Sequence, residues 1–337
     1  MEPRGCFAQP EGTRLHVCVN GQGVWGTRDK VATFLKLDKD DVHVTTPDVG
    51  GGFGMKAMEY PETFLCAYAA RTLRRAVAWM SDRSEAMQSD NAGRDLNSTA
   101  TLGFDADHRL IAYRVDTVAN MGAYNSEYAQ PIQTELFSKV DAYRGAGRPE
   151  AIYVLERSLD HAARQMGIDP WELRRRNFIR PDQFPYVSAT GQPYDVGDFE
   201  RVLARVGQEA DRDGFAARRA DSASAGKLRG QGLCYYIESI LGSPVETARV
   251  DFNANNTASI FVGTQSGGQG HETVFAQFLS DQTGIPADQI TVVQGDSDLI
   301  ATGGGTGGSR SVTVQNTATL ATVEAITEGF VRFPCRH

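Results

Sequence analysis

The sequence contains few cysteines, and their spacing excludes several kinds of site. Only five of the 337 residues are cysteine, and no two of them have the C-x-x-C spacing of a zinc site or an iron–sulfur cluster. An odd number of cysteines without a disulfide framework is typical of a reducing compartment. The cysteines therefore indicate neither a disulfide scaffold nor a resident metal cluster.

An excess of positive charge and a long apolar run are also absent. The formal net charge is -8, from 34 Lys and Arg against 42 Asp and Glu, and a nucleic-acid-binding protein is usually basic. No apolar run approaches the length of a membrane span, and residues 1–10 lack the apolar core of a signal peptide. We therefore expect a cytoplasmic protein with no membrane span and no nucleic-acid partner.

Glycine, in contrast, is abundant, and the 35 glycines are clustered. Most clusters follow an expected strand and precede an expected helix, where backbone N–H groups stabilise anions and oxo groups. Gln22 and Gln269 are flanked by glycine, so their amides can approach a ligand closely. Several such loops indicate a large polar ligand held between two domains. The loops are 21–26, 50–54, 145–147, 267–270 and 303–308.

The first of these loops resembles a dinucleotide-binding fingerprint, Gly21-x-Gly23-x-x-Gly26. That fingerprint requires an acidic residue at the end of the second strand, to bind the ribose hydroxyls. Here the acidic residues at 38–41 precede the second expected strand, which ends in Thr45 and Thr46. An NAD- or FAD-dependent oxidoreductase of this type is therefore the less favoured alternative.

The chain also repeats one series of elements. Residues 14–52 and 257–298 both read as strand, glycine loop, helix, short acidic loop and strand. The helix of the first copy is expected over 27–37, with Thr27 as its N-cap. An expected two-stranded hairpin turns at 105–109. These patterns predict an α+β fold with two related domains that face a common site.

A stretch rich in proline and glycine, 181–198, marks the expected boundary between the domains. The first domain is then 1–185 and the second is 186–337.

Four motifs occur in an order that resembles one enzyme family: "PDVGGGFGMK", "AYRGAGRPEA", "GTQSGGQGHET" and "GTGGSRS". They are similar to motifs of the molybdenum-cofactor-binding large subunit of the xanthine dehydrogenase, aldehyde oxidase and aerobic carbon monoxide dehydrogenase family. The resemblance covers essentially the whole chain. It implies two related molybdopterin-binding domains with mixed sheets and packed helices.

The resemblance also implies an activity, cofactors and partners. The activity is that of an oxidoreductase, a molybdenum hydroxylase that hydroxylates an aldehyde or N-heteroaromatic substrate with oxygen from water. The cofactor is molybdenum–molybdopterin cytosine dinucleotide. Electrons pass to [2Fe-2S] clusters on an iron–sulfur small subunit and to FAD on a medium subunit. The intact enzyme is expected to be a dimer of heterotrimers.

The same resemblance assigns roles to residues of the four motifs and of the first glycine loop. Gln22 hydrogen-bonds an oxo ligand of molybdenum, Phe53 and Gly54 line the metal, and Arg144 flanks the substrate. The metal itself has no direct protein ligand, because the pterin carries it. The pterin and dinucleotide contacts are assigned to Gly268, Gln269, Gly270 and His271. The pyrophosphate and nucleotide end is assigned to Thr306, Gly308, Ser309, Arg310 and Ser311.

Each assignment has a simpler structural alternative. The glycines at 50–52 would form a tight turn alone, and Phe53 would be ordinary core. Arg144 and Arg310 would pair with acidic groups of the same chain, and His271 would cap the helix that follows it.

The sequence departs from the family pattern at several positions. Gly145 stands where copper-containing carbon monoxide enzymes have cysteine, and Ala57 stands where purine enzymes have glutamate. These two departures argue against carbon monoxide and purine substrates. Val140 and Asp141 read as the junction of an internal deletion. The general-base glutamate of the family has no counterpart, so we expect a truncated copy, and a non-catalytic remnant is the alternative.

Overall fold

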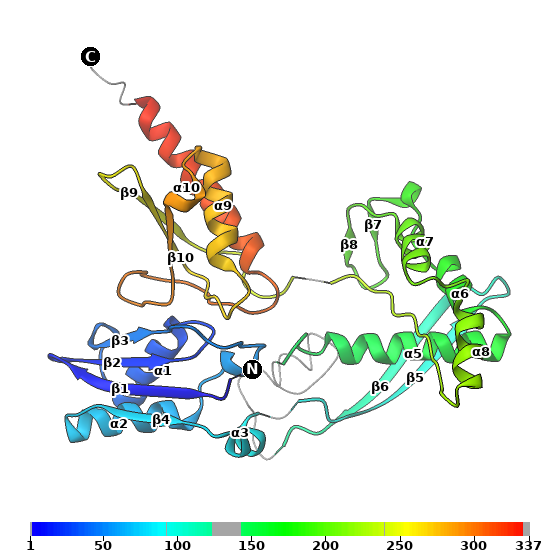
Figure 1. Ribbon diagram of the computed structural model, residues 1–337, viewed down its shortest axis with the longest axis horizontal. Coiled ribbons are helices and arrows are strands. Elements are labelled where there is room, and N and C mark those ends of the chain that lie inside the picture. The colour runs from blue at the N-terminus through cyan, green and yellow to red at the C-terminus, as the bar shows by residue number, and fades with distance from the viewer. Residues whose placement is uncertain (1, 92, 123–142, 239, 333–337) are drawn as a thin grey trace. The chain divides into compact units, whose positions relative to one another are not determined.

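The computed structural model describes residues 2–91, 93–122, 143–238 and 240–332 (Figure 1). The chain divides into two compact units. The first unit comprises Met1–Arg94, Met121–Gly147 and Glu238–His337, and the second comprises Asp95–Asn120 and Arg148–Ile237. The expected deletion junction at 140/141 lies outside the described residues. The division into cofactor-binding domains at 185/186 stays a prediction.

The first half of the first unit is a four-stranded sheet covered on one face by two helices. The strand order is β3-β2-β1-β4, with β2 and β3 parallel and the other neighbours antiparallel. Alternate side chains of the strands enter one core, because successive residues of a strand face opposite sides. The elements are β1 (Gly5–Glu11), β2 (Arg14–Val19), α1 (Trp25–Leu35), β3 (Val42–Thr45), α2 (Pro61–Leu73), β4 (Val77–Met80) and α3 (Arg83–Ser89), with short 3-10 turns at Lys39–Asp41 and Met55–Ala57.

The second half of the first unit has its own three-stranded sheet, of order β11-β10-β9. Its core contains Ile260 of the central strand and Phe275 and Leu279 of the helix that covers it. The elements are β9 (Ala248–Phe252), β10 (Ala258–Val262), α9 (His271–Thr283), β11 (Ile290–Val293) and α10 (Ser311–Arg332), with a 3-10 turn at Ala287–Gln289.

The two halves have the same topology, which confirms the repeat predicted from the sequence. In each half an antiparallel strand pair leads through a glycine loop to a helix, a 3-10 turn and a strand parallel to the second one. The carboxyl ends of parallel strands lie at one edge of a sheet. The loops after β2 and β3 therefore leave one edge together, and so do the loops after β10 and β11.

The start of α1 differs from the prediction. The helix begins at Trp25 rather than at Thr27, and no side chain caps it. The Thr27 hydroxyl instead donates a hydrogen bond to Glu59 at 3.0 Å. Thr27 therefore binds Glu59 of a distant loop instead of capping the start of α1.

A backbone seam joins the two halves of the first unit. The N–H of Thr46 donates to the carbonyl of Gly295 at 2.8 Å, and that of Ser297 donates to the carbonyl of Val44 at 3.0 Å. The guanidinium of Arg14 contacts both carboxylate oxygens of Asp298, at 2.6 and 2.7 Å. The segment after β11 is thus attached to the edge of the first sheet at β3.

The second unit is built around a long hairpin and a helix. β5 (Leu96–Phe104) and β6 (Leu110–Ala119) pair antiparallel around the predicted turn, and α5 (Arg148–Met166) packs on β5. Buried Arg174 contacts Glu156 at 2.8 Å and Asp160 at 2.9 Å. The remaining elements are α6 (Pro170–Arg176), a 3-10 turn at Pro181–Gln183, β7 (Tyr186–Val187), β8 (Pro193–Tyr194), α7 (Phe199–Glu209) and α8 (Phe215–Ser224).

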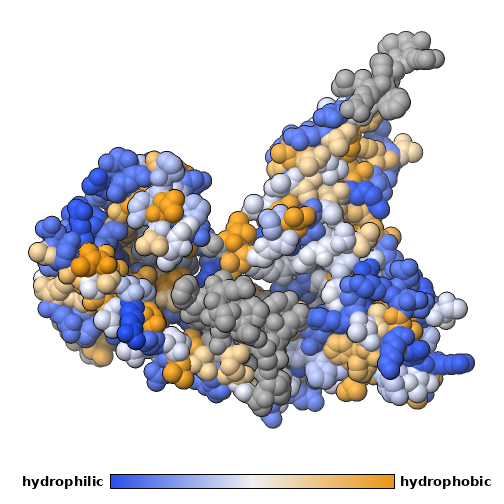
Figure 2. Space-filling model, turned by 180° about the vertical axis from the view of Figure 1, so that it is seen from behind, coloured by the Kyte–Doolittle hydropathy of each residue, from blue (hydrophilic) through white to orange (hydrophobic). Residues whose placement is uncertain are grey.

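Within the described ranges, no helix combines the length and the apolar composition that a bilayer span requires. On the face drawn in Figure 2, apolar side chains are interspersed among hydrophilic ones.

The ion pair between Arg14 and Asp298 predicts how the stability of the fold depends on pH. The Arg14 guanidinium holds the pKa of Asp298 below its usual value, so folding favours the ionised carboxylate. The resulting stabilisation is present above the unfolded pKa of about 3.9 and is lost as pH falls through the lower folded pKa. Between about pH 5 and 3, the free energy of unfolding should therefore fall more in the native chain than in Asp298→Asn. Urea unfolding across this range is the measurement, and parallel curves would contradict the prediction.

Candidate functional site

Gln22 lies in the loop between β2 and α1, and its side chain connects two other loops. Its Nε2 donates to the carbonyl of Thr306 at 2.8 Å, and its Oε1 accepts from the N–H of Gly54 at 2.8 Å. Its backbone carbonyl accepts from the N–H of Thr306 at 2.7 Å. One residue therefore links the loop after β3 to the loop that precedes α10.

Glycines permit this close approach. A Cβ on Gly52 would lie 2.6 Å from the Gln22 side chain. A Cβ on Gly305, where φ is +63°, would lie 2.4 Å from the Gln22 carbonyl oxygen. Real Cβ atoms do not approach other atoms so closely, so both positions require glycine for contact, and Gly305 requires it for conformation as well.

The loop of residues 49–56 is anchored from two sides. The N–H of Gly51 donates to the carbonyl of Gly267 at 3.1 Å. The ammonium of Lys56 is buried and donates to the carbonyl of Val49 at 2.5 Å. Burial lowers the pKa of Lys56, because the charged form loses solvation. The loop is thus attached to the second half of the unit as well as to itself.

Phe53 and Arg144 form a partly exposed pair beside this loop. The Arg144 guanidinium lies over the Phe53 ring at 4.3 Å from its centroid, and 43% of Phe53 is exposed. The N–H of Arg144 donates to the Phe53 carbonyl at 2.9 Å. Phe53 has φ +55°, an uncommon conformation for a bulky residue, which the loop contacts maintain. The pair presents an aromatic face and a cation to a ligand.

The loop between β10 and α9 presents an open backbone. Gly268 and Gly270 have positive φ, and no atom lies within 4 Å of a Cβ built on either of them. The Gln269 side chain turns back, and its Oε1 accepts from the N–H of Gly267 at 2.5 Å. A bulky ligand can therefore approach this backbone directly.

His271, the first residue of α9, is almost fully buried, with 2% of its surface exposed. Its Nδ1 has no hydrogen-bond partner among the described residues, and its ring packs on Phe275 at 5.0 Å between centroids. Burial lowers its pKa, so the imidazole is neutral near pH 7. A buried nitrogen without a partner indicates a position completed by a ligand or by water.

The loop before α10 places three hydroxyl groups at the start of that helix. The Thr306 hydroxyl accepts from the N–H of Gln265 at 3.1 Å and lies 2.9 Å from the Ser311 hydroxyl. Ser309 is exposed and donates to Glu238 at 3.1 Å. A Cβ on Gly308 would lie 2.5 Å from the Leu241 carbonyl oxygen. The loop is therefore held from both sides, while Ser309 remains accessible.

Arg310 is directed into the protein and supports the loop. It is 4% exposed and donates to three backbone carbonyls and to the buried carboxylate of Glu246 at 3.1 Å. The three carbonyls belong to Ser243, Gly305 and Val245. In this arrangement its donors are directed to the protein rather than to the surface.

The structure adds polar groups that the sequence reasoning did not select. Thr46 Oγ1 and Gln265 Oε1 are buried and have no partner among the described residues. The Trp25 indole N–H donates to the Ile300 carbonyl at 2.9 Å across the seam. The nearest sequence signal was the repeat of the strand–glycine loop–helix series, which places Gln265 or Gln269 near the position of Gln22.

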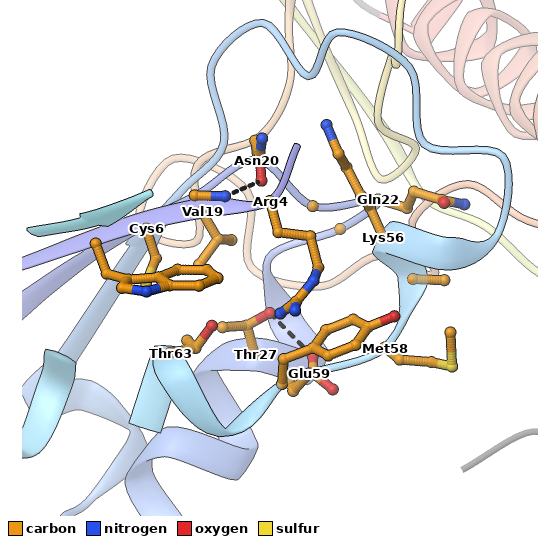
Figure 3. A pocket seen from close by; sticks show the side chains of 16 residues that line it. Arg4, Cys6, Val19, Asn20, Gln22, Thr27, Lys56, Met58, Glu59 and Thr63 are labelled. Carbon is orange, nitrogen blue, oxygen red and sulfur yellow. Dashed lines mark hydrogen bonds between the residues drawn. The ribbon is translucent and has the colours of Figure 1, made fainter. Parts of the chain in front are cut away.

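A small cavity of about 50 Å³ lies beside Gln22 and Lys56. In Figure 3 the Arg4 side chain lies among the residues that line this cavity, and a dashed line marks the hydrogen bond from Thr27 to Glu59. Glu59 also pairs with Lys30. Glu59 therefore makes its contacts at the start of α1.

Comparison with family models gives two matches of the same kind. A model described as a molybdopterin cofactor-binding domain matches residues 1–142 and 132–178. A second molybdopterin cofactor-binding domain matches residues 205–333.

Two curated proteins illustrate the similarity in sequence. The nicotine 6-hydroxylase large subunit of Paenarthrobacter nicotinovorans is 30% identical over 93% of this chain and 43% of its own length. The carbon monoxide dehydrogenase large chain of Hydrogenophaga pseudoflava is 30% identical over 94% of this chain and 45% of its own length. The chain therefore spans less than half the length of these relatives.

Solved structures agree over nearly the whole chain. Quinoline 2-oxidoreductase from Pseudomonas putida 86 superposes with a TM-score of 0.90 at 27% identity, over 97% of this chain and 47% of that one. A Cu,Mo-containing carbon monoxide dehydrogenase superposes with a TM-score of 0.87 at 28% identity, over the same share of each chain.

The close contact between Gly305 and the Gln22 carbonyl predicts the effect of a substitution on stability. Gly305→Ala should destabilise the first unit by at least about 1 kcal/mol, because the methyl group meets the Gln22 carbonyl and φ is positive. Gly307→Ala is the matched control, since nothing lies within 4 Å of a Cβ there. Urea unfolding of both variants tests the difference. Equal midpoints would show that the backbones do not meet at Gly305.

Proposed function

The chain belongs to the molybdenum-cofactor-binding large-subunit family of xanthine dehydrogenase, aldehyde oxidase and carbon monoxide dehydrogenase, and we propose that it forms the cofactor-binding part of a molybdenum hydroxylase. The reaction would be the oxidative hydroxylation of an aldehyde or N-heteroaromatic compound. The observation that carries the proposal is the connection of the two glycine-rich halves through Gln22.

The residues present fit a molybdopterin cofactor. The open glycine backbone at Gly268 and Gly270 leaves room for a large polar group, and His271 offers a buried nitrogen without a partner among the described residues. Backbone N–H groups precede both α9 and α10, where a phosphate-bearing group is stabilised. When bound, the cofactor supplies the redox chemistry, and the protein supplies binding, orientation and hydrogen-bond donors.

Different parts of the site would contact different parts of the cofactor. Gly268, Gln269, Gly270 and His271 would hold the pterin and dinucleotide, and Thr306, Gly308, Ser309 and Ser311 would hold the pyrophosphate end. Arg310 would act through the loop that it supports, since its donors are directed to the protein. We propose the cytosine dinucleotide form.

Gln22 and Gly54 would face the metal. For the Gln22 amide nitrogen to donate to an oxo group, it would exchange its present bond to the Thr306 carbonyl. The Gly54 N–H is likewise bonded to Gln22 Oε1. Cofactor binding would therefore reorganise this small network, and loop stability and cofactor affinity would be linked.

Phe53 and Arg144 would orient the substrate. The exposed ring supplies a flat apolar surface, and the guanidinium above it attracts a carbonyl oxygen or ring nitrogen. Gly145 and Ala57 stand where copper-binding cysteine and the purine-site glutamate would be, so we propose neither carbon monoxide nor a purine as substrate.

Electron transfer would need other chains. We propose an iron–sulfur small subunit and an FAD-binding medium subunit as partners, in a cytoplasmic dimer of heterotrimers. The relatives' names, a large subunit and a large chain, support the presence of partner subunits. The alternative is a non-catalytic form that binds cofactor without turnover.

Cofactor content tests the proposed function. The chain, purified with and without its iron–sulfur and flavin partners, should contain close to one molybdenum and one cytosine nucleotide per chain. Elemental analysis and nucleotide release by acid measure the two quantities. Absence of both from every preparation would contradict the proposal. Full occupancy without turnover of any aldehyde or N-heterocycle would favour the non-catalytic alternative.

Arg144→Ala should abolish turnover of the assembled enzyme while molybdenum content is unchanged, because the residue would orient the substrate. Arg144→Lys retains charge but lacks the planar group that stacks on Phe53, so it should raise KM more than it lowers kcat. Steady-state kinetics with metal analysis separates the two effects. Turnover by Arg144→Ala at the native rate would remove this residue from the site.

A further inference from the structure

The outer edge of β6 is an unpaired strand edge in the second unit. The hairpin of β5 and β6 is a two-stranded sheet, and β6 pairs only with β5 among the described residues. Nearly all of β6 is exposed, including the apolar side chains of Ile111, Tyr113, Val115 and Val118. A long, exposed edge of this composition is a template for pairing with another strand. We propose that this edge pairs antiparallel with β6 of a second copy of the chain.

The direction of the backbone groups limits the possible registers. The N–H of Asn120 donates to the carbonyl of Asp95, so Asn120 faces β5. Backbone groups of successive residues alternate between the two edges of a strand. Tyr113, Val115 and Thr117 therefore direct their N–H and C=O groups to the free edge. The exposed groups of two copies meet when a two-fold axis passes through one of these residues or through a residue between them.

Charge then selects one register. With the axis at Val115, Arg114 of each copy lies opposite Asp116 of the other, in a non-hydrogen-bonded pair where side chains are closest. With the axis at Tyr113, Arg114 faces Ala112 and Asp116 faces Leu110. With the axis at Thr117, Asp116 faces Val118. With the axis at Arg114 or at Asp116, that residue faces the same residue of the other copy, so like charges meet. Only the axis at Val115 makes the charges self-complementary.

The uncharged positions also agree with this register. The axis at Val115 places Val115 against itself and Tyr113 against Thr117 on the side of the hairpin that carries Leu102. β-Branched and aromatic side chains are favourable cross-strand partners. In the single copy, Arg114 and Asp116 pair with each other at 2.9 Å while 76% and 60% exposed, so both remain available to a second strand.

The test uses two opposite charge reversals in the full-length chain. Arg114→Asp places Asp against Asp in a pair of copies, and Asp116→Arg places Arg against Arg. Each variant alone should dimerise at least tenfold more weakly than the native chain, which corresponds to about 1.4 kcal/mol. An equimolar mixture should recover dimers that contain one copy of each variant, because Asp then faces Arg throughout. Arg157→Asp on α5 is the control with the same charge change and should leave dimerisation unaltered.

Sedimentation velocity measures the dimer fraction, and native mass spectrometry identifies the mixed dimer by mass. Loss of dimer in both single variants and its return in the mixture would support the proposed pairing. Each variant also removes the ion pair between Arg114 and Asp116 of its own strand. If that pair only stabilises the hairpin, mixing the two variants should not restore the dimer. A native chain that stays monomeric up to about 100 μM, a dimer insensitive to both reversals, or a strand of another protein on this edge would overturn the proposal.

Discussion

The first unit depends on a contact between two backbones at Gln22 and Gly305. No side chain separates them, because a Cβ at Gly305 would occupy the position of the Gln22 carbonyl oxygen. The amide of Gln22 then binds one loop on each side. The positions of Phe53, Thr306 and the helices that follow are set relative to this contact. A site of this kind requires glycine for spacing more than for flexibility.

The repeated topology explains why the loops gather. Each half of the first unit has a parallel strand pair, and the loops after both strands leave at the carboxyl edge. The seam of backbone hydrogen bonds between Thr46 and Gly295 and between Val44 and Ser297 joins those edges. Four loops from distant parts of the sequence thereby border one region. The buried partnerless atoms of Thr46, Gln265 and His271 are found in these loops or at the start of the helix that follows.

Much of this arrangement was predictable from local patterns. The hairpin turn at 105–109 and the repeated strand–loop–helix series both correspond to elements that the structure contains. The first turn of α1 was misplaced because Thr27 binds Glu59, a residue 32 positions away. Pairing of Arg310 with an acidic group was stated as the simpler alternative, and the structure shows it with Glu246. The identity of that partner and the bond between Trp25 and Ile300 were inaccessible, since both depend on packing between segments far apart in sequence. Local pattern locates the loops, and tertiary contact decides which side chains face inward.

The separation in sequence between the two halves has a consequence for synthesis. Gln22 and its partner Thr306 are 284 positions apart. A ribosome adding about 5–20 residues per second needs roughly 15–60 s to span this distance. During that time the first sheet is complete while the edge at β3 still lacks its backbone partners. The backbone groups of Val44 and Thr46 therefore stay open to other partners until residues 295–306 have been translated.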